Sequence, residues 1–375
     1  MILAAWMRLI GWILPAGRSE WVQAMAAEVS GMTGRLERVR LAIGCLWAAL
    51  TLRERFHRRP LESSGIPVFG IACAFGATAI GLAYLKLAGA PSGILAINGA
   101  AFGMGLVAIA AMHRIGNASV TAMACWPWVG AILTLAAVVL GREVDGATRW
   151  VAVSGLFIQT SLLAVPAAVV AFARQTTPLS AAAMIGIAIG LALQPDRAMA
   201  GALLAGLTAT AWRRGGPLTW VPLGAAGVSF ASTLLQPDKL PAVPFVDGIL
   251  WTSFGIHTAM GAALWLGCAT LVAPALLGWR QHGMLSPATA SFSATWAAII
   301  AAAAIGAYPT PVVGYGSSAI IGYLASLPLL AAGKPQPGKA AGRAASATED
   351  TENGMPLKPG GIESNWLEAA IRPLP

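Results

Sequence analysis

Long apolar runs separated by short polar or charged turns dominate the sequence from residue 66 to residue 332. A run of about 20 apolar residues can cross a bilayer as a helix. Each run is expected to be helical, because an open strand would leave its backbone groups unpaired in lipid. The ten runs are 66–89, 93–112, 119–141, 152–173, 178–194, 197–212, 217–236, 248–276, 288–308 and 312–332. This pattern predicts an all-α, polytopic integral membrane bundle of about ten transmembrane helices.

The apolar runs divide the chain into three parts. Residues 1–65 mix apolar residues with nine Arg, which predicts a cytoplasmic, amphipathic extension at the membrane surface, close to anionic lipid. Residues 66–333 form the predicted transmembrane domain. Residues 334–375 are rich in Pro, Gly, Ala, Ser and charged residues, and this composition is typical of a disordered tail.

The composition excludes several classes of protein. Hydrophobic residues make up 57% of the 375 residues and charged residues 10%, whereas about 25% of the residues of a soluble domain are charged. A soluble globular enzyme, a disordered protein and a disulfide scaffold are therefore excluded. The net charge of +9 would suggest nucleic-acid binding in a soluble protein. Here the positions of the charges indicate membrane topology instead, so no nucleic-acid partner is expected.

The Lys and Arg residues gather on one side of the predicted topology. With the N-terminus in the cytoplasm and ten spans, nineteen of them lie in cytoplasmic segments and four in outer segments. Cytoplasmic segments of membrane proteins carry such an excess of basic residues. The distribution therefore supports an even number of spans, with both termini in the cytoplasm.

The acidic residues show the opposite distribution. Between residues 63 and 348 there are five, and all fall in predicted outer segments: Glu143, Asp145, Asp196, Asp238 and Asp247. Acids do not set topology, so two interpretations stay open. These residues are ordinary polar loop residues, or they belong to an outward-facing cleft that needs carboxylates. No pair of His residues has metal-ligand spacing, and no metal held by protein ligands is expected.

Four short motifs in the outer segments resemble those of a known family. Residues 145–150 (DGATRW) and 159–161 (QTS) resemble its N-G-A-x-R-W and Q-P-S-E stretch, and residues 194–196 (QPD) its Q-P-D. Residues 244–249 (PFVDGI) fall where the family has H-T-D-F-I, and residues 311–318 (PVVGYGSS) resemble its P-F-x-S-Y-G-G-S. In this order, at these spans, the motifs make residues 66–333 similar to the SEDS family (shape, elongation, division and sporulation), also called the FtsW/RodA/SpoVE family.

The resemblance implies a peptidoglycan glycosyltransferase of the bacterial cytoplasmic membrane, acting in cell division or cell-shape maintenance. Such proteins polymerise lipid II, an undecaprenyl-pyrophosphate-linked disaccharide, at the outer face of the membrane. They usually act with a class B penicillin-binding protein. No cofactor is implied beyond a divalent cation at the outer cleft.

The same resemblance assigns roles to individual residues. Asp247 matches the family's essential aspartate, which is thought to deprotonate the acceptor hydroxyl or to help place a cation on the pyrophosphate. Arg149 is expected to hold phosphate oxygens, because a guanidinium binds them bidentately. The other expected substrate-binding residues are Trp150, Gln159, Ser161, Gln194, Asp196, Tyr315 and Ser318.

The chain also departs from the family's pattern. The family's Glu and Lys fall on Leu162 and Val165, its His-Thr on Phe245-Val246, and its acidic pair on Gly255 and Ile256. Asp247 is therefore expected in an apolar neighbourhood, where burial raises the pKa of a carboxyl. These losses favour an alternative, a catalytically silent SEDS-like scaffold or regulator of envelope synthesis. The topology also permits a lipid-linked sugar flippase or transporter, although the inner half of the predicted bundle has no acids to line an ionisable pathway.

Overall fold

The computed structural model describes residues 27–28, 34, 65–114, 120–144, 146–153, 155–237 and 241–330. The chain divides into two units, Met1–Ala332 and Gly333–Pro375, and the fold is that of residues 65–330 in the first unit. The predicted tail, nearly all of the predicted extension, and the acids Asp145 and Asp238 lie outside the described residues.

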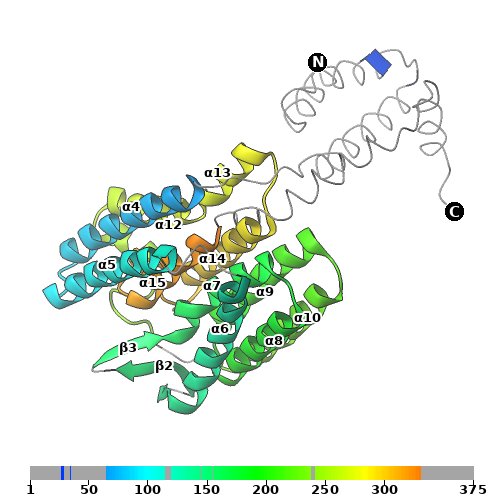
Figure 1. Ribbon diagram of the computed structural model, residues 1–375. Coiled ribbons are helices and arrows are strands. Elements are labelled where there is room, and N and C mark those ends of the chain that lie inside the picture. The colour runs from blue at the N-terminus through cyan, green and yellow to red at the C-terminus, as the bar shows by residue number, and fades with distance from the viewer. Residues whose placement is uncertain are drawn as a thin grey trace, which may run out of the picture. The chain divides into compact units, whose positions relative to one another are not determined.

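Each of the ten apolar runs contains a helix, and the helices pack side by side (Figure 1). The first six are α4 (Gly65–Leu87), α5 (Ser92–Arg114), α6 (Val120–Leu140), α7 (Thr160–Arg174), α8 (Pro178–Leu193) and α9 (Arg197–Arg214). They are followed by α10 (Pro217–Leu234), α11 (Ile249–Thr252), α12 (Thr258–Leu271), α13 (Ala273–His282), α14 (Pro287–Ile305) and α15 (Ser317–Ser326). The 3-10 turns η1 (Ser253–Gly255) and η2 (Pro328–Leu330) complete the helical elements of the described residues between 65 and 330. The fold is therefore the predicted multi-pass helical bundle.

Three of the described helices are long and apolar enough to cross a membrane by themselves: Gly65–Leu87, Ser92–Met112 and Pro287–Ile305. The pair Thr258–Leu271 and Ala273–Arg280, bent by 46°, makes a fourth if it is counted as one span. Other apolar helices, among them α7 and α8, are shorter than the roughly 20 residues that a straight span needs. The apolar runs therefore predict where the helices lie better than they predict how long each helix is.

The fourth run is only partly helical, which corrects the prediction that all ten runs are helices throughout. Three strands, β1 (Arg142–Val144), β2 (Ala147–Val153) and β3 (Leu156–Gln159), form an antiparallel sheet before α7. Val153 pairs with Leu156 where β2 and β3 meet, and Gly155 beside this pair has φ +81°. The strands satisfy one another's backbone groups, and glycine supplies the positive φ that a tight hairpin turn requires.

The eighth run is also not one helix. α11 ends at Thr252 and is followed directly by η1, which ends at Gly255. α12 begins at Thr258 with His257 as its N-cap, whose Nδ1 accepts from the N–H of Ala259 at 3.1 Å. His257 lies exposed at this cap, in a break within the eighth apolar run. A proline in the first turn of α13 then accompanies the bend after α12, because proline favours the start of a helix and disrupts its interior.

Helix α7 lies at the centre of the bundle. It packs against α6, α8, α9, α14 and α15, and almost all of its side chains are buried. Small residues allow this close packing. A Cβ added at Gly322 of α15 would collide with the carbonyl oxygen of Leu162 on α7, and one at Gly206 of α9 would lie 2.7 Å from Val169 on α7.

An aromatic cluster joins α14 and α15. The rings of Trp296 and Tyr323 meet edge to face with centroids 5.0 Å apart, and the Phe292 ring lies 5.4 Å from that of Tyr323. The Tyr323 hydroxyl donates to the carbonyl of Leu271 on α12 at 2.9 Å. All three rings are fully buried, so the hydroxyl needs this partner to avoid the cost of an unpaired polar group in the core.

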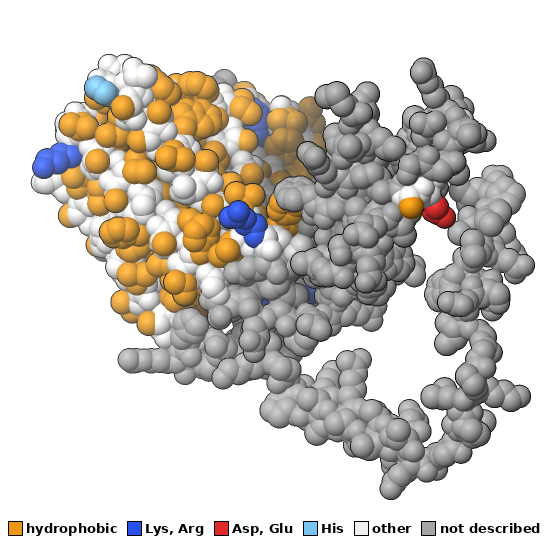
Figure 2. All heavy atoms as spheres, turned by 90° about the horizontal axis from the view of Figure 1, so that it is seen from above, with side chains coloured by type: hydrophobic (Ala, Val, Ile, Leu, Met, Phe, Trp, Pro, Cys, Tyr) orange, Lys and Arg blue, Asp and Glu red, His pale blue; other side chains and the backbone are white. Residues whose placement is uncertain are grey.

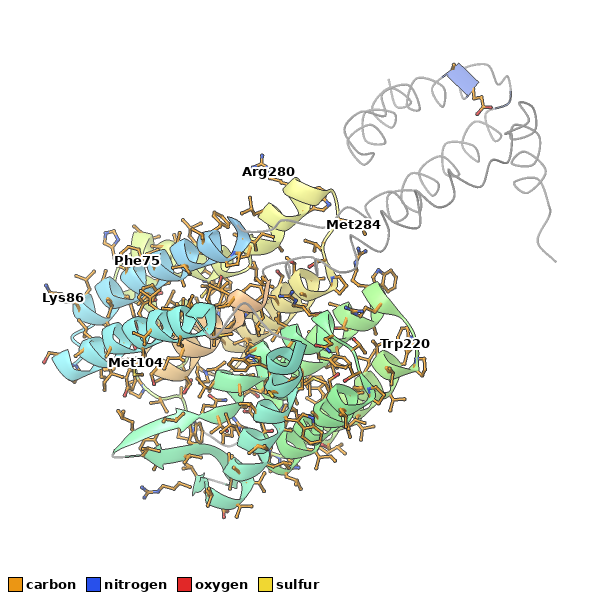
Figure 3. The ribbon with its side chains drawn as sticks, viewed as in Figure 1. Phe75, Lys86, Met104, Trp220, Arg280 and Met284 are labelled. Carbon is orange, nitrogen blue, oxygen red and sulfur yellow. The ribbon has the colours of Figure 1, made fainter. Side chains whose placement is uncertain are left out.

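The outer surface of the bundle is mostly apolar. Figure 2 shows one face covered by hydrophobic side chains with a few isolated charges. The labelled side chains of Phe75, Met104 and Trp220 in Figure 3 are all exposed. In the same view the side chains of Lys86 and Arg280 lie near the ends of α4 and α13. Apolar sides with charges at the ends are what a bilayer requires of a bundle.

Replacing Gly322 with Ala should destabilise the bundle, because the new methyl group would press on the backbone of α7. Overpacking of this kind typically costs about 1–3 kcal/mol. We expect a lower melting temperature for Gly322→Ala in detergent, measured by thermal unfolding. Gly224→Ala on α10 is the matched control, since no atom lies within 4 Å of its added Cβ. Equal melting temperatures for the two variants would contradict the close approach of α7 and α15.

Candidate functional site

The three-stranded sheet carries the first set of expected site residues. Along β2, Ala147 and Arg149 are buried, and Trp150 is partly exposed. Trp150 pairs with Gln159 at the end of β3 and with Arg142 on β1. The Arg149 guanidinium donates through Nη2 to the carbonyl of Pro195 in the turn between α8 and α9. The sheet therefore lies against that turn, next to the N-terminus of α7.

Asp196 joins the sheet, α7 and α9. Its Oδ2 accepts from Nε2 of Gln159 at 3.0 Å and from Oγ of Ser161 at 2.8 Å. Its Oδ1 accepts from the N–H of Met199 at 3.3 Å, which makes Asp196 the N-cap of α9. Asp196 is fully buried, and a buried carboxylate is tolerated only when donors surround it. Both of its oxygens already have partners within the protein.

Gln194 and Ser161 are part of the same packing. Gln194 is fully buried and donates through Nε2 to the carbonyl of Thr134 on α6. Ser161 is fully buried and donates to Asp196. Neither residue lines the cavity described below. The structure thus places these two expected substrate-binding residues behind the cavity wall, where they hold together the helices that form it.

Asp247 lies in the loop before α11. Its Oδ2 accepts from the N–H of Val243 at 2.8 Å, and its own N–H donates to the Val243 carbonyl at 3.0 Å. Its Oδ1 is buried and has no hydrogen-bond partner among the described residues. Burial raises the pKa of the Asp247 carboxyl, while the Val243 N–H and the positive charge of Arg149 act in the opposite direction. This agrees with the expectation drawn from its apolar neighbours in the sequence.

The Asp247 loop is attached to the loop that precedes α15. Asp247 forms an antiparallel bridge with Pro309, the Thr310 N–H donates to the Val246 carbonyl at 2.9 Å, and the Tyr315 N–H donates to the Phe245 carbonyl at 2.8 Å. Two segments that are more than sixty residues apart therefore form one structural unit.

Both of these loops contain a strained residue. Phe245 has φ +65° and Val312 has φ +68°, a region that bulky and β-branched residues rarely adopt. Such conformations cost about 1–3 kcal/mol each and persist only where surrounding contacts impose them. The hydrogen bonds between the loops supply part of that constraint.

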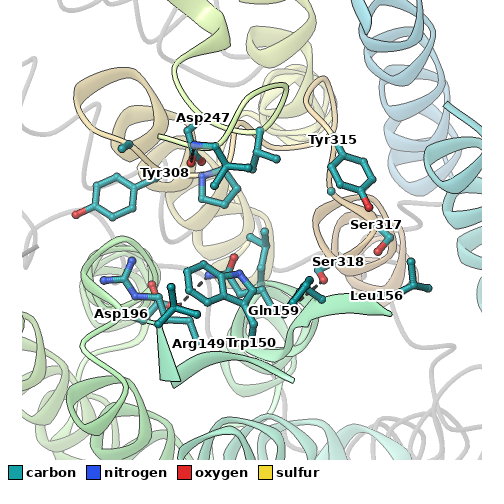
Figure 4. Close-up of a pocket in the computed structure, with 18 of the residues that line it drawn as sticks. Arg149, Trp150, Leu156, Gln159, Asp196, Asp247, Tyr308, Tyr315, Ser317 and Ser318 are labelled. Atoms are coloured by element: carbon teal, nitrogen blue, oxygen red, sulfur yellow. Dashed lines mark hydrogen bonds between the residues drawn. The ribbon is translucent and has the colours of Figure 1, made fainter. Parts of the chain in front are cut away.

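These elements surround a cavity of about 370 Å³. Figure 4 shows Asp247 on one side of it and Trp150, Gln159 and Asp196 on the other. Its charged lining residues are Arg149, Asp196 and Asp247. Its other lining residues include the expected Tyr315 and Ser318, and the apolar side chains Val144, Leu156, Phe157 and Leu162. The cavity therefore has a polar part, in which one carboxylate oxygen lacks a hydrogen-bond partner among the described residues, and an apolar wall along the sheet.

Ser318 closes the cavity on the α15 side. Its Oγ accepts from the backbone N–H of Gln159 at 3.1 Å, so the first turn of α15 is tied to the end of β3. The resemblance indicates Gln159 and Ser318 from two separate motifs, and the structure shows that they are in contact.

Sequence reasoning missed two residues at this site. Tyr308 lines the cavity, and only its rarity (the chain has four Tyr) marks it out. Asn98 on α5 binds the backbone before α15. It is the one amide side chain in the apolar run 93–112, and a polar residue at such a position indicates a buried partner or a function.

The departures from the family's pattern are visible in the cavity wall. Leu162 lines the cavity as an apolar side chain, and Val165 is fully buried in the core of the bundle. Gly255 and Ile256 are exposed and do not line the cavity. The charged groups expected of the family at these positions are replaced by packing on α7 and by a turn before α12.

No group of three His, Cys, Asp or Glu side chains within the described part of the chain could hold a metal ion. At the cavity the oxygens of Asp196 are occupied by protein donors, which leaves Asp247 as the available carboxylate. Such a donor set fits a hard cation only where substrate phosphates supply further oxygens, which is a usual arrangement for Mg²⁺.

Comparisons with known proteins find similarity in solved structures. No family model matches the chain, and no curated protein matches it. A crystal structure of the rod shape-determining protein RodA from Thermus thermophilus is 21% identical with a TM-score of 0.48, over 71% of this chain and 94% of that chain. A mutant of the same protein is 22% identical with a TM-score of 0.47, over 71% of this chain and 95% of that chain. A chain of a peptidoglycan synthase complex that coordinates polymerization and crosslinking is 19% identical with a TM-score of 0.45. The match covers 69% of this chain and 95% of that chain. At these identities the similarity concerns the fold.

Replacing Asp196 with Ala should strongly destabilise the protein, because three buried donors would lose their acceptor. A hydrogen bond to a charged group contributes about 1.5–3 kcal/mol, so we expect the free energy of unfolding to fall by about 3 kcal/mol or more, measured by denaturation in detergent. Ser161→Ala removes one donor and should have a smaller effect. Glu143→Gln, on the exposed strand β1, is the control. A variant Asp196→Ala as stable as Glu143→Gln would rule out this structural role.

Proposed function

We propose that this chain is a divergent SEDS-type peptidoglycan glycosyltransferase that polymerises lipid II at the outer face of the bacterial cytoplasmic membrane. One observation supports the proposal above all. The four segments that resemble the family's motifs are distant in the sequence, yet each contributes residues to one cavity: Arg149 and Trp150, Asp196, Asp247, and Tyr315 with Ser318.

The cavity can perform the proton transfer that glycosyl transfer needs. The acceptor sugar hydroxyl attacks the anomeric carbon of the donor, the bond from that carbon to the pyrophosphate oxygen breaks, and the hydroxyl proton must go to a base. Asp247 presents an oxygen with no partner among the described residues. A carboxylate in hydrogen-bond reach of the hydroxyl is a general base, and a pKa raised by burial makes it a stronger one.

The leaving pyrophosphate gathers negative charge as its bond breaks. Arg149 lines the same cavity, and its position on β2 is fixed by the bond from Nη2 to the Pro195 carbonyl. A fixed positive charge near a leaving group lowers the barrier, because it costs no reorganisation when the charge develops. A divalent cation bound by Asp247 and substrate phosphates would supply further positive charge.

The apolar wall suits the lipid part of such a substrate. Val144 of β1, Leu156 and Phe157 of β3, and Leu162 of α7 line the cavity beside its polar residues. An undecaprenyl chain needs apolar surface next to the site that binds its pyrophosphate. In this proposal both termini are cytoplasmic, the sheet end of the bundle faces outward, and a class B penicillin-binding protein is the partner for crosslinking in division or cell-shape maintenance.

Replacing Asp247 with Asn should abolish polymer formation, because the amide cannot accept the acceptor's proton. General base catalysis contributes about 10²–10⁴-fold, so we expect glycan synthesis from lipid II to fall at least 100-fold while expression is unchanged. The assay uses purified protein in detergent, with and without a divalent cation. Glu143→Gln is the matched control, an exposed carboxylate on β1 outside the cavity lining. Wild-type polymerisation by Asp247→Asn would refute the catalytic role.

A second candidate function follows from the apolar cavity wall. Leu162 and Val165 provide no ionisable groups where the family has a Glu and a Lys, which favours a catalytically silent scaffold or regulator of envelope synthesis. The polymerisation assay and a complementation test in cells separate the two proposals. Long glycan strands from the wild type alone support the enzyme. A cellular deletion phenotype that is fully restored by Asp247→Asn supports the scaffold.

The pH dependence of polymerisation should report the environment of Asp247. A general base works only when ionised, so the rate should rise with pH through the pKa of Asp247. Because burial raises this pKa, we expect the acidic limb of the rate profile above the value of about 3.9 of an ordinary aspartate. Arg149→Gln removes the charge that lowers this pKa and should move the limb to higher pH, whereas Arg149→Lys should move it less. A limb that moves to lower pH in Arg149→Gln would contradict this electrostatic account.

A further inference from the structure

Asn98 is a buried polar residue on α5, and its neighbours along this helix are apolar. It lies in the second turn of α5, and 1% of its surface is exposed. Its amide would be costly there without partners, because an apolar environment leaves both the donor and the acceptor unsatisfied. Its partners therefore indicate why the bundle contains an amide at this position.

Both partners of Asn98 are backbone groups more than 200 residues away in sequence. Nδ2 donates to the carbonyl of Gly314 at 2.9 Å, and Oδ1 accepts from the N–H of Gly316 at 3.2 Å. The amide thus binds the two peptide groups that flank Tyr315, much as a neighbouring β-strand would. Tyr315, held between them, lines the cavity.

The segment that Asn98 binds also holds the Asp247 loop. Tyr315 donates its N–H to Phe245, Thr310 donates to Val246, and Pro309 bridges to Asp247. The chain of contacts therefore runs from α5 through residues 309–316 to the loop that carries the proposed base.

These two loops need contacts from outside themselves. Phe245 and Val312 are held in left-handed backbone conformations, and such conformations relax unless other contacts impose them. From the α4 side, Gly81 packs so closely on Val313 that an added Cβ would collide with its carbonyl. From the α5 side, Asn98 supplies two directed hydrogen bonds. The close packing of Gly81 restricts where the Val313 backbone can lie. The hydrogen bonds of Asn98 determine which peptide groups of the loop face α5.

We propose that Asn98 is a positioning residue, which holds Tyr315 and the Asp247 loop in the geometry that the reaction requires. This inference rests on the proposed function for its catalytic consequence. It does not rest on that function for its structural consequence, because the order of the two loops is measurable in a protein of any activity.

Two variants of Asn98 separate positioning from packing. Asn98→Leu keeps the size of the side chain and removes both hydrogen bonds. Asn98→Asp in its protonated form again offers one donor and one acceptor, whereas its ionised form offers only acceptors and faces the Gly314 carbonyl. The titratable side chains on the helices packed against α5 are Cys73, Tyr84 and Lys86 of α4 and Tyr323 of α15. None of these is a carboxyl or an imidazole, so the carboxyl that Asn98→Asp introduces is the new group that titrates there in the acidic range.

Ser229→Ala is the matched control. Ser229 is also buried, and its Oγ donates at 2.7 Å to the Ala188 carbonyl, which ties α10 to α8. It does not line the cavity. The control therefore removes a buried tie of similar kind from a part of the bundle that does not hold the two loops.

We expect Asn98→Leu to lower the rate of lipid II polymerisation by about 10–100-fold, because small displacements of catalytic groups have effects of that size. Ser229→Ala should keep the wild-type rate. The rate of Asn98→Asp relative to wild type should be highest at acidic pH and fall as pH rises, whereas that of Asn98→Leu should not vary with pH. A wild-type rate for Asn98→Leu, or identical pH profiles for the two variants, would overturn the proposal.

Hydrogen–deuterium exchange makes the test independent of activity. Residues 243–248 and 309–316 should take up deuterium faster in Asn98→Leu than in the wild type, and α8 and α10 should not change. If the wild type makes no polymer and the two loops still loosen, the proposed function fails and the positioning role stands. If uptake by the two loops is unchanged in Asn98→Leu, the positioning role fails whatever the enzyme does.

Discussion

The hydrogen bonds that Asp196 accepts from Gln159 and Ser161 fix the point at which the sheet becomes a helix. Gln159 ends β3, and Ser161 lies in the first turn of α7, so one carboxylate holds both sides of this junction. The same carboxylate caps α9. The sheet is thereby placed against the α8–α9 turn, and the position of Arg149 follows from it. A charge without solvent exposure is costly unless several donors stabilise it, which explains why the surrounding polar residues point inward to Asp196.

The two acids of the cavity illustrate how burial and hydrogen bonding divide their roles. Asp196 has partners within the protein for both oxygens, and its contribution is structural. Asp247 has one oxygen bonded and the other without a partner in the described part of the chain. Burial raises the pKa of the Asp247 carboxyl, and a carboxylate that burial has made more basic is a better proton acceptor. In the proposed function, Asp247 is therefore the residue that takes the proton.

The sequence predicts the helices well, because a bilayer demands long apolar runs and short polar turns. It does not predict the sheet, since residues 152–159 are nearly all apolar and show no alternation of apolar and polar side chains. The sequence feature that indicates the strand turns is the pair of glycines at 146 and 155. The motif resemblance identifies Arg149 and Asp247 as candidate site residues, and in the structure both line one cavity. It cannot distinguish residues that face a cavity from residues that support it, as Gln194 and Ser161 show. The sequence does not predict the role of Asn98, because its partners lie more than 200 residues away.

The burial of α7 has a consequence for how the protein responds to its membrane. At 15 residues the helix is about 22 Å long at 1.5 Å per residue, less than the roughly 30 Å of hydrocarbon in a bilayer. A lipid-facing helix of this length would force the membrane to thin around it. Other helices surround α7 instead, so its side chains contact protein and not lipid. The helices that expose large apolar side chains, α4 and α5 among them, meet the lipid instead, so the short length of α7 places no demand on bilayer thickness.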